Sequence, residues 1–218
     1  MNVLRILAVA VFLSALPALG IGQTTWWYVD DDAPNDPGPG DPMISDPDED
    51  GSPQHPFDAI QEGLDAAADG HTVIVLPSTY SPPGAYVENI VFPARAITLR
   101  SINPQDPGLV EVTVIRAVGG GSVVTFGPGT PSDAVIDGFS VEGGNAMLGG
   151  GILCESASPT VMNCVIEGNT AVDRGAGIFC DNGSAPVITN CALVSNTGGG
   201  LGCQYSSPTI VNCRIEGN

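Results

Sequence analysis

SPTVMNCVIEGN, residues 158–169, returns as APVITNCALVSN at residues 185–196 and again as SPTIVNCRIEGN at residues 207–218. The equivalent cysteines, Cys164, Cys191 and Cys213, lie 27 and then 22 residues apart. Self-similarity with a period in this range indicates a solenoid, in which one supersecondary unit stacks on copies of itself. The repeat therefore predicts the architecture clearly and carries much less information about function.

The repeat also predicts which side chains fill the interior. Side chains alternate between the two faces of a β-strand, so a position that stays apolar in every copy belongs to the inner face. Val161, Cys164 and Ile166 are apolar in all three copies, whereas Met162 and Val165 are replaced by threonine and arginine in other copies. We therefore expect the first three to point inward and the last two to point outward.

Two asparagines recur in every copy, represented by Asn163 and Asn169. We expect both series to lie at corners of the coil. Asparagine tolerates left-handed backbone there, and its amide can bond the identical asparagine of the next coil.

The region before the repeats predicts one helix and several short strands. Phe57, Ile60 and Leu64 have the spacing of one helix face, which predicts a helix over residues 56–69, with Gly70 as its stop. Short β-branched runs separated by Pro, Gly and Asn predict strands, with no further helical segment between them. These runs are Trp26–Val29, Thr72–Leu76, Glu88–Phe92, Ala96–Arg100, Val112–Ile115 and Ser122–Phe126.

These motifs together resemble a known family. PFDAIQEGLDAA, GHTVIVLPSTY, AITLRS, VIDGFSVEGGN and the final coils are similar to the right-handed parallel β-helix repeat proteins of the pectin lyase-like class. The resemblance covers roughly residues 57–218. It implies an all-β fold, a right-handed parallel β-helix (β-solenoid) with a short N-terminal capping helix. It implies little about activity, because the class includes lyases, hydrolases, adhesins and proteins of unassigned role.

The six cysteines follow the repeat. One series is Cys154, Cys180 and Cys203, and the other is Cys164, Cys191 and Cys213. Equal positions in neighbouring parallel strands lie about 4.8 Å apart, which is within reach of a disulfide. A series of three leaves one cysteine over, which favours stacks of buried free thiols. A disulfide within a stack remains the alternative. No CxxC or Cys/His spacing supports a zinc site.

The N-terminal segments differ from the solenoid. Residues 1–22 combine Arg5, an apolar core over Ile6–Leu19 and a small-residue cleavage site, the layout of a secretory signal peptide. The apolar core is about 14 residues long, short of the ~20 that span a bilayer. We expect a protein secreted or displayed at the cell surface, with no membrane insertion after cleavage.

The sequence thus divides into three segments, of which the signal peptide, residues 1–22, is the first. Residues 23–56 contain the first strand and an acidic, proline-rich arm, and residues 57–218 form the β-helix. Asn218 completes a repeat with no capping segment after it, which would leave strand edges unpaired. We therefore expect the sequence to be a fragment of a solenoid truncated at the C-terminus.

The charge balance restricts the partners. The formal net charge is −18, and all six basic residues are arginines. A nucleic-acid partner would need a basic face to neutralise phosphates, so we expect none. The same repulsion disfavours polyuronates and anionic membranes unless a divalent cation bridges them.

One stretch has the pattern of a metal site. Asp46, Asp48 and Asp50 stand at alternate positions before Gly51, as in the first half of a calcium loop. The glutamate expected at position 12 is replaced by Phe57. We take these three aspartates as candidate Ca²⁺ ligands, with a plain acidic loop as the alternative.

No catalytic group can be assembled from the repeats. The hydrolase signatures of the pectin lyase-like class, an Asn-Thr-Asp run, an Asp-Asp pair, a Gly-His-Gly and an Arg-Ile-Lys, do not occur there. The leading hypothesis is an exported structural or binding module whose partner is an extracellular glycan or another surface component. The alternative is a polysaccharide lyase or glycoside hydrolase with its active site on side loops or in missing C-terminal coils.

Overall fold

The computed structural model describes residues 25–33, 46–78 and 84–218. The predicted signal peptide and residues 34–45 of the predicted acidic arm lie outside the described residues. The described chain consists mainly of short parallel strands, with two short helices, α1 (Ile60–Ala66) and α2 (Pro107–Val112). No helix in this part of the chain is long and apolar enough to cross a membrane.

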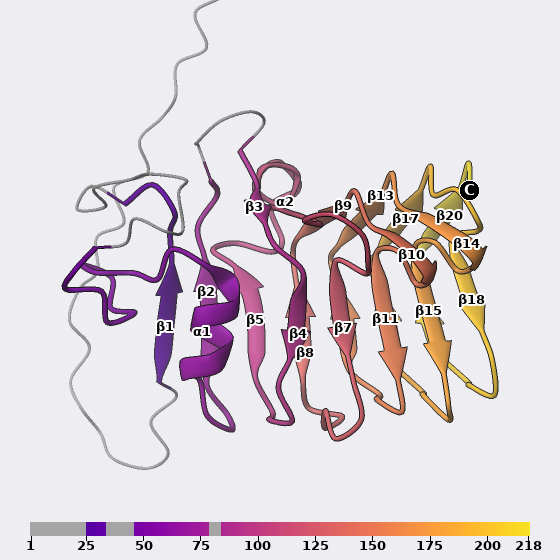
Figure 1. Ribbon diagram of the computed structural model, residues 1–218, viewed down its shortest axis with the longest axis horizontal. Helices are drawn as coiled ribbons and strands as arrows, with labels where there is room; N and C mark the ends of the chain where they lie inside the picture. Colours follow the sequence, from indigo (N-terminus) through magenta and orange to yellow (C-terminus); the bar gives the residue numbers. More distant parts are fainter. Residues whose placement is uncertain (1–24, 34–45, 79–83) are drawn as a thin grey trace, which may run out of the picture.

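Three parallel sheets run along the length of the molecule (Figure 1). Sheet A has the order β1 (Trp26–Val29), β2 (Thr72–Val75), β5 (Thr98–Ser101), β8 (Val135–Asp137), β12 (Thr160–Met162), β16 (Val187–Thr189) and β19 (Thr209–Val211). Sheet B has the order β3 (Tyr86–Val87), β6 (Val114–Arg116), β9 (Ser140–Glu142), β13 (Val165–Glu167), β17 (Ala192–Val194) and β20 (Arg214–Glu216). Sheet C has the order β4 (Ile90–Phe92), β7 (Val124–Phe126), β11 (Ile152–Glu155), β15 (Ile178–Asp181) and β18 (Leu201–Cys203).

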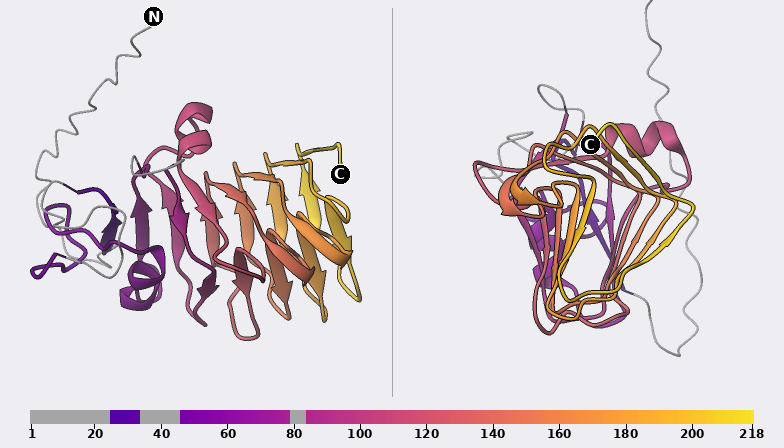
Figure 2. Two further views of the ribbon diagram at one scale, coloured as in Figure 1. Left: turned by 45° about the horizontal axis from the view of Figure 1, so that its top comes forward. Right: turned by 90° about the vertical axis from the view of Figure 1, so that its right-hand side faces the viewer.

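The chain visits the three sheets in a fixed sequence. From β2 onward it passes from sheet A to sheet B to sheet C and then begins the next coil. The right-hand panel of Figure 2 looks along this stack and shows successive coils superposed on one another. Two coils also carry an outer ribbon made by β10 (Asn145–Leu148) and β14 (Thr170–Arg174), which pair in parallel. The predicted parallel β-solenoid is confirmed.

The repeat sets the register between coils. Cys154 pairs with Cys180 and Cys180 with Cys203, while Val161 pairs with Ile188 in sheet A. The positions predicted to point inward are buried in the first two copies, and Phe139 fills the interior one coil before Cys164. In the last copy Ile210 and Ile215 are 43% and 46% exposed. All six cysteines are free thiols; four are buried as predicted, whereas Cys203 is exposed and Cys213 is half-buried.

Two amide ladders run along the solenoid, as predicted. In the first, Asn212 Nδ2 donates to Asn190 Oδ1 and Asn190 Nδ2 to Asn163 Oδ1, at 2.8 and 3.2 Å. These asparagines have left-handed backbone, with φ between 51° and 54°. The second ladder contains Asn169 and Asn196, which are buried and lack the left-handed backbone that we expected for both series. Asn169 Nδ2 donates to Asn196 Oδ1 at 3.0 Å and Asn196 Nδ2 to Asn218 Oδ1 at 2.8 Å, as predicted. The Asn169 and Asn196 amides also donate to backbone carbonyls inside the coil.

Helix α1 is shorter than predicted. It spans Ile60–Ala66, because the residues before it already pair with β1. Phe57 forms a parallel bridge with Val29, and its ring packs on Trp27. Ala67 is already extended. The helix packs against β1, β2 and β4 through Ile60 and Leu64. Its role as an N-terminal cap of the barrel stays a prediction.

Helix α2 contradicts the expectation that no further helix follows. It spans Pro107–Val112, so Val112 belongs to a helix and the next strand, β6, begins at Val114. Asp106 accepts a hydrogen bond from the Gly108 amide at 2.9 Å, and proline occupies the first helical position. Both are ordinary helix-start signals, and they outweigh the β-branched residues that follow.

Candidate functional site

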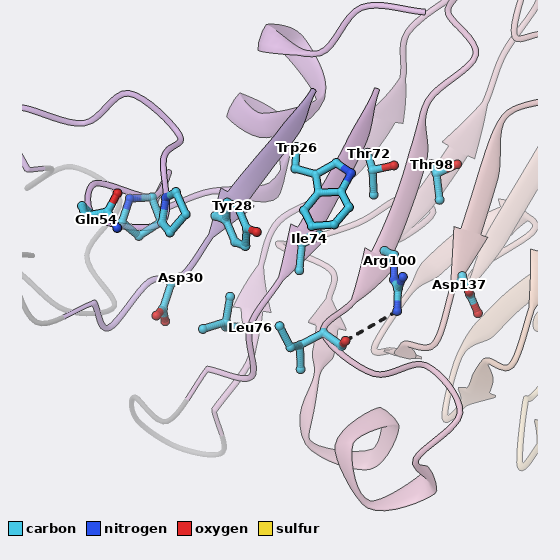
Figure 3. Close-up of a pocket in the computed structure, with 13 residues that line it drawn as sticks. Trp26, Tyr28, Asp30, Gln54, Thr72, Ile74, Leu76, Thr98, Arg100 and Asp137 are labelled. Atoms are coloured by element: carbon cyan, nitrogen blue, oxygen red, sulfur yellow. Dashed lines mark hydrogen bonds between the residues drawn. The ribbon is translucent and has the colours of Figure 1, made fainter. Parts of the chain in front are cut away.

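A groove lies on the outer face of sheet A, over its first strands (Figure 3). Its volume is about 690 Å³. The residues that line it come from β1, β2, β5, β8 and the loop before α1: Trp26, Tyr28, Asp30, Pro53, Gln54, Pro56, Thr72, Ile74, Leu76, Thr98, Arg100, Ile102 and Asp137. The strand residues all occupy outward positions, because alternate side chains of a strand share one face.

The parallel register arranges these side chains in rows across the strands. Trp26 pairs with Thr72 and Thr72 with Thr98, which forms one row. A second row runs from Tyr28 through Ile74 and Arg100 to Asp137. Neighbouring members of a row are separated by the strand spacing of about 4.8 Å. The groove therefore has an ordered, rigid base that consists of backbone-paired residues.

The loop of residues 46–57 forms one wall of the groove. It pairs with β1 through the Tyr28 amide, which donates to the Gly51 carbonyl, and through the Phe57 amide, which donates to the Tyr28 carbonyl, both at 2.9 Å. Gly51 has a φ of +72°, and a Cβ there would lie 2.4 Å from the Phe57 ring. Only glycine fits this turn, which holds Gln54 against the groove.

The groove offers an aromatic ring and an apolar floor. Trp26 is 53% exposed, which is unusual for a large apolar side chain. Tyr28 and Ile74 are nearly covered and form the floor beside it. Thr72 and Thr98 place hydroxyl groups along the same face. Apolar surface bordered by a few convergent polar groups is typical of a small-molecule binding site.

Arg100 and Asp137 lie together at the end of the groove formed by β5 and β8 (Figure 3). Arg100 Nε donates to the Ser101 carbonyl at 3.2 Å and Nη2 to the Ile102 carbonyl at 3.5 Å. Asp137 Oδ1 accepts from Asn163 Nδ2 at 2.7 Å, so the outer amide ladder ends on this carboxylate. Burial raises the pKa of Asp137, and the hydrogen bond from Asn163 and the charge of Arg100 oppose that rise.

Asp30 lies at the opposite end, next to Tyr28 and Gln54 (Figure 3). Burial, and then the neighbouring carboxyl of Asp32, raise the pKa of Asp30 to about 8. The carboxyl is therefore protonated at neutral pH. Its Oδ1 atom is buried and has no hydrogen-bond partner among the described residues.

The predicted calcium ligands lie in the loop beside the groove and do not line it. Asp46 is buried, and its Oδ1 accepts from the Asp48 amide at 3.0 Å. Asp50 Oδ1 accepts from the Ser52 amide at 2.9 Å. Within the described chain, the ligand atoms of these three aspartates do not all converge within 4.8 Å. Those of Asp30, Asp31 and Asp32 do. Calcium binding at Asp46, Asp48 and Asp50 stays a prediction.

The two histidines have structural contacts. His55 Nδ1 lies 2.6 Å from Asp46 Oδ2, and this hydrogen bond raises the pKa of His55 and lowers that of Asp46. The pair closes the loop that carries Gln54. His71 Nδ1 accepts from Trp27 Nε1 at 3.0 Å and from the Ala68 amide at 3.1 Å. His71 therefore fixes the turn between α1 and β2.

Sequence reasoning did not identify the groove. Its side chains are isolated outward residues of separate strands, from Trp26 to Asp137, and no local motif connects them. The usable signal was the pairing of the early strands with the repeat. Aligning Thr98-Leu99-Arg100 with Val135-Ile136-Asp137 would have placed Arg100 and Asp137 side by side.

Comparison with known proteins identifies the fold family. A family model described as right handed beta helix region matches residues 102–218. No curated protein and no solved structure matches the chain significantly. The matched range includes Ile102 and Asp137 of the groove and excludes its other lining residues. The match covers more than half of the chain and agrees with the parallel coils described above. The chain therefore belongs to the right-handed β-helix family.

Proposed function

We propose that this protein binds a carbohydrate chain in the groove on sheet A and acts as a binding module. The observation that carries the proposal is the half-exposed Trp26, next to an apolar floor and within a cavity of about 690 Å³. The C–H face of a sugar ring packs on an aromatic ring, while its hydroxyl groups need hydrogen-bond partners at the rim.

The rim of the groove supports this assignment. Thr72 and Thr98 offer hydroxyl groups, and Gln54 offers an amide that both donates and accepts. Arg100 and Asp137 supply charged hydrogen-bonding groups at the far end. Apart from Gln54, these groups come from separate strands in fixed register, so little ordering entropy is lost when an extended chain binds across them.

Replacing the aromatic ring tests the proposal. Isothermal titration calorimetry would compare wild type, Trp26→Ala and Trp26→Phe on a panel of neutral and charged hexasaccharides. We expect Trp26→Ala to weaken binding about tenfold and Trp26→Phe to weaken it less, because an aromatic face remains. Tyr205→Ala is the matched control, since Tyr205 is the other highly exposed aromatic ring among the described residues and lies outside the groove. Absence of binding by wild type, or equal binding by Trp26→Ala, would refute the proposal.

One observation favours a second function, glycoside hydrolysis. Asp30, whose pKa is raised to about 8, holds the proton that a general acid needs. Asp137 cannot be its partner, because three strand spacings, about 14 Å, separate Asp137 from the Asp30 end of the groove. The two carboxyl groups of a glycosidase lie about 5–9.5 Å apart, so the second group would have to come from elsewhere in the chain. This candidate predicts product formation by wild type and none by Asp30→Asn. The binding-module proposal predicts that wild type leaves every oligosaccharide of the panel intact, which chromatography of the incubated samples would measure.

We also propose that the chain is exported and meets its ligand outside the cytoplasm, without a nucleic-acid partner. The support is the signal-peptide layout of residues 1–22 and the formal net charge of −18. Expression of the full sequence followed by fractionation should yield a processed chain that begins near residue 23, in the medium or on the cell surface. An unprocessed chain retained in the cytoplasm would contradict this.

A further inference from the structure

We propose that the saccharide bound in the sheet A groove is a cationic amino sugar, with its ammonium group beside Asp30 and the Trp26 and Tyr28 rings. The inference rests on the proposed carbohydrate-binding function and names its ligand class. Trp26, Tyr28 and Asp30 are alternate residues along one strand direction and line the same groove. They combine two aromatic faces with a carboxyl group, which is the chemistry that binds an ammonium ion.

The charges in the groove are distributed unevenly. Arg100 is the only basic residue among the described residues that line it, and it lies at the same end as Asp137. Its charge is therefore opposed by a neighbouring carboxylate. Among the described lining residues, none at the Asp30 end is basic, and the other polar groups there are Gln54 and the Tyr28 hydroxyl (Figure 3). A positive ligand group is favoured at the Asp30 end and disfavoured at the Arg100 end.

The surroundings of Asp30 supply no cation of their own in the described chain. The titratable groups that act on it are Asp31 and Asp32 of the same turn, and the Tyr86 hydroxyl approaches from β3. All of these are acidic. Asp30 Oδ1 is buried without a hydrogen-bond partner among the described residues. A ligand N–H⁺ group would give this oxygen a charged donor and would relieve the repulsion within the turn.

The net charge of the whole molecule also favours a cationic ligand. A formal net charge of −18 attracts cations over a range of about one Debye length and repels anionic sugars such as uronates. Among saccharides with aromatic-stacking faces, those with a free amine combine both requirements. An N-acetylated sugar keeps the ring face and loses the charge, so it serves as the discriminating probe.

Binding has a measurable proton balance. At about pH 7 Asp30 is a neutral acid, since its pKa is raised to about 8. When an ammonium group binds beside it, the carboxyl ionises: the ammonium keeps its proton, the carboxylate forms an ion pair with it, and one proton passes to the buffer. Calorimetry in two buffers of different ionisation enthalpy measures this release directly.

The experiment uses the full chain at about pH 6, where the sugar amines and Asp30 are both protonated, with glucosamine hexamer, N-acetylglucosamine hexamer, cellohexaose and trilysine. We expect glucosamine hexamer to bind about tenfold more tightly than the two uncharged hexamers, with net proton release that the uncharged hexamers lack. Asp30→Asn should remove both the preference and the proton release, so that glucosamine hexamer and cellohexaose bind the variant with equal affinity. Asp133→Asn is the matched control, because Asp133 is an exposed carboxylate in the turn before β8, far from Asp30. This variant should preserve both the preference for glucosamine hexamer and the proton release.

Each other outcome is informative. Equal affinity for the three hexamers would overturn the amino-sugar inference and leave carbohydrate binding intact. If none of the hexamers binds, the proposed function itself is wrong. Trilysine binding as tightly as glucosamine hexamer would make the site a general ammonium site and overturn the assignment to a sugar. Proton release that persists in Asp30→Asn would show that another group takes the cation.

Discussion

At the residue scale, the buried asparagines explain how a polar side chain can belong to a hydrophobic interior. Asn196 is 1% exposed, yet its amide donates to the Ile166 and Val194 carbonyls at 2.9 and 3.1 Å. Its Oδ1 accepts from the backbone N–H of Asn169 at 3.1 Å. One side chain thus satisfies backbone groups of two coils where the corner interrupts the sheet ladder. Buried backbone groups need such partners.

Removing this side chain should be costly. Asn196→Ala leaves the Ile166 carbonyl and the Asn169 N–H without this partner, so we expect a loss of about 2–3 kcal/mol in the free energy of unfolding. Asn190→Gly is the control: it removes an amide of the exposed ladder and keeps the left-handed backbone, where φ is 54°. Its cost should stay below about 1 kcal/mol. Urea denaturation measures both, and equal losses would contradict the distinction between the ladders.

At the element scale, helix α1 is held by groups from outside the helix. Its N-cap residue, Ala59, makes no side-chain cap bond. The Glu88 carboxylate accepts instead from the Ile60 and Gln61 amides at 2.8 and 3.0 Å. The Gln61 side chain bonds both backbone groups of Val91 on the edge strand β4. The helix therefore takes the place of a further strand beside sheet C and is docked by its neighbours.

Glu88 should accordingly be more important for α1 than the acids on the helix itself. Glu88→Ala removes the partner of two first-turn amides, and we expect a loss of about 2 kcal/mol together with faster hydrogen exchange at Ile60 and Gln61. Glu62→Gln removes the charge of an exposed acid of the same helix turn and keeps an acceptor for the Ala59 amide, so it should cost within about 0.5 kcal/mol. Exchange rates at the two amides that are the same in Glu88→Ala and wild type would show that the helix is held by other contacts.

How much could be predicted also differs between elements. The final coils were predictable because each inward position, such as Cys164, is repeated and its apolar character is visible in several copies. Helix α2 was missed because Val112 and Val114 suggested a strand, although Asp106 and Pro107 carried the stronger local signal. The groove was not predictable from local motifs, since Trp26 and Asp137 become neighbours only through the stacking of coils.

At the scale of the whole molecule, the excess of acids makes stability depend on pH. Burial is the main cause that raises the pKa of Asp30, Glu88 and Asp137 above their ordinary values. The folded chain therefore keeps protons that the unfolded chain releases once the pH exceeds about 4. Because the folded state binds more protons, stability falls as the pH rises, for Asp30 up to about pH 8.

The hydrogen bond between His55 and Asp46 also makes stability fall as the pH rises, whereas Asp46 and Asp50 make stability fall at acid pH. The Asp46 hydrogen bond raises the pKa of His55, so its contribution is complete below the unfolded value of about 6.5 and is lost as the pH rises through the folded value. Hydrogen bonds from His55 and Ser52 lower the pKa of Asp46 and Asp50 respectively, so their contributions are lost as the pH falls below about 4.

We therefore expect the melting temperature to be highest between about pH 5 and pH 6 and to decline toward pH 8. Thermal unfolding followed by circular dichroism at constant ionic strength measures it. Asp30→Asn should flatten the decline above about pH 6, because the buried group that must ionise is gone, whereas Asp133→Asn should follow the wild-type curve. A melting temperature that rises from pH 5 to pH 8 would mean that the buried carboxyls are already ionised in the folded chain. In that case Asp30 would stand in the groove as a carboxylate, and an ammonium ligand would bind there without releasing a proton.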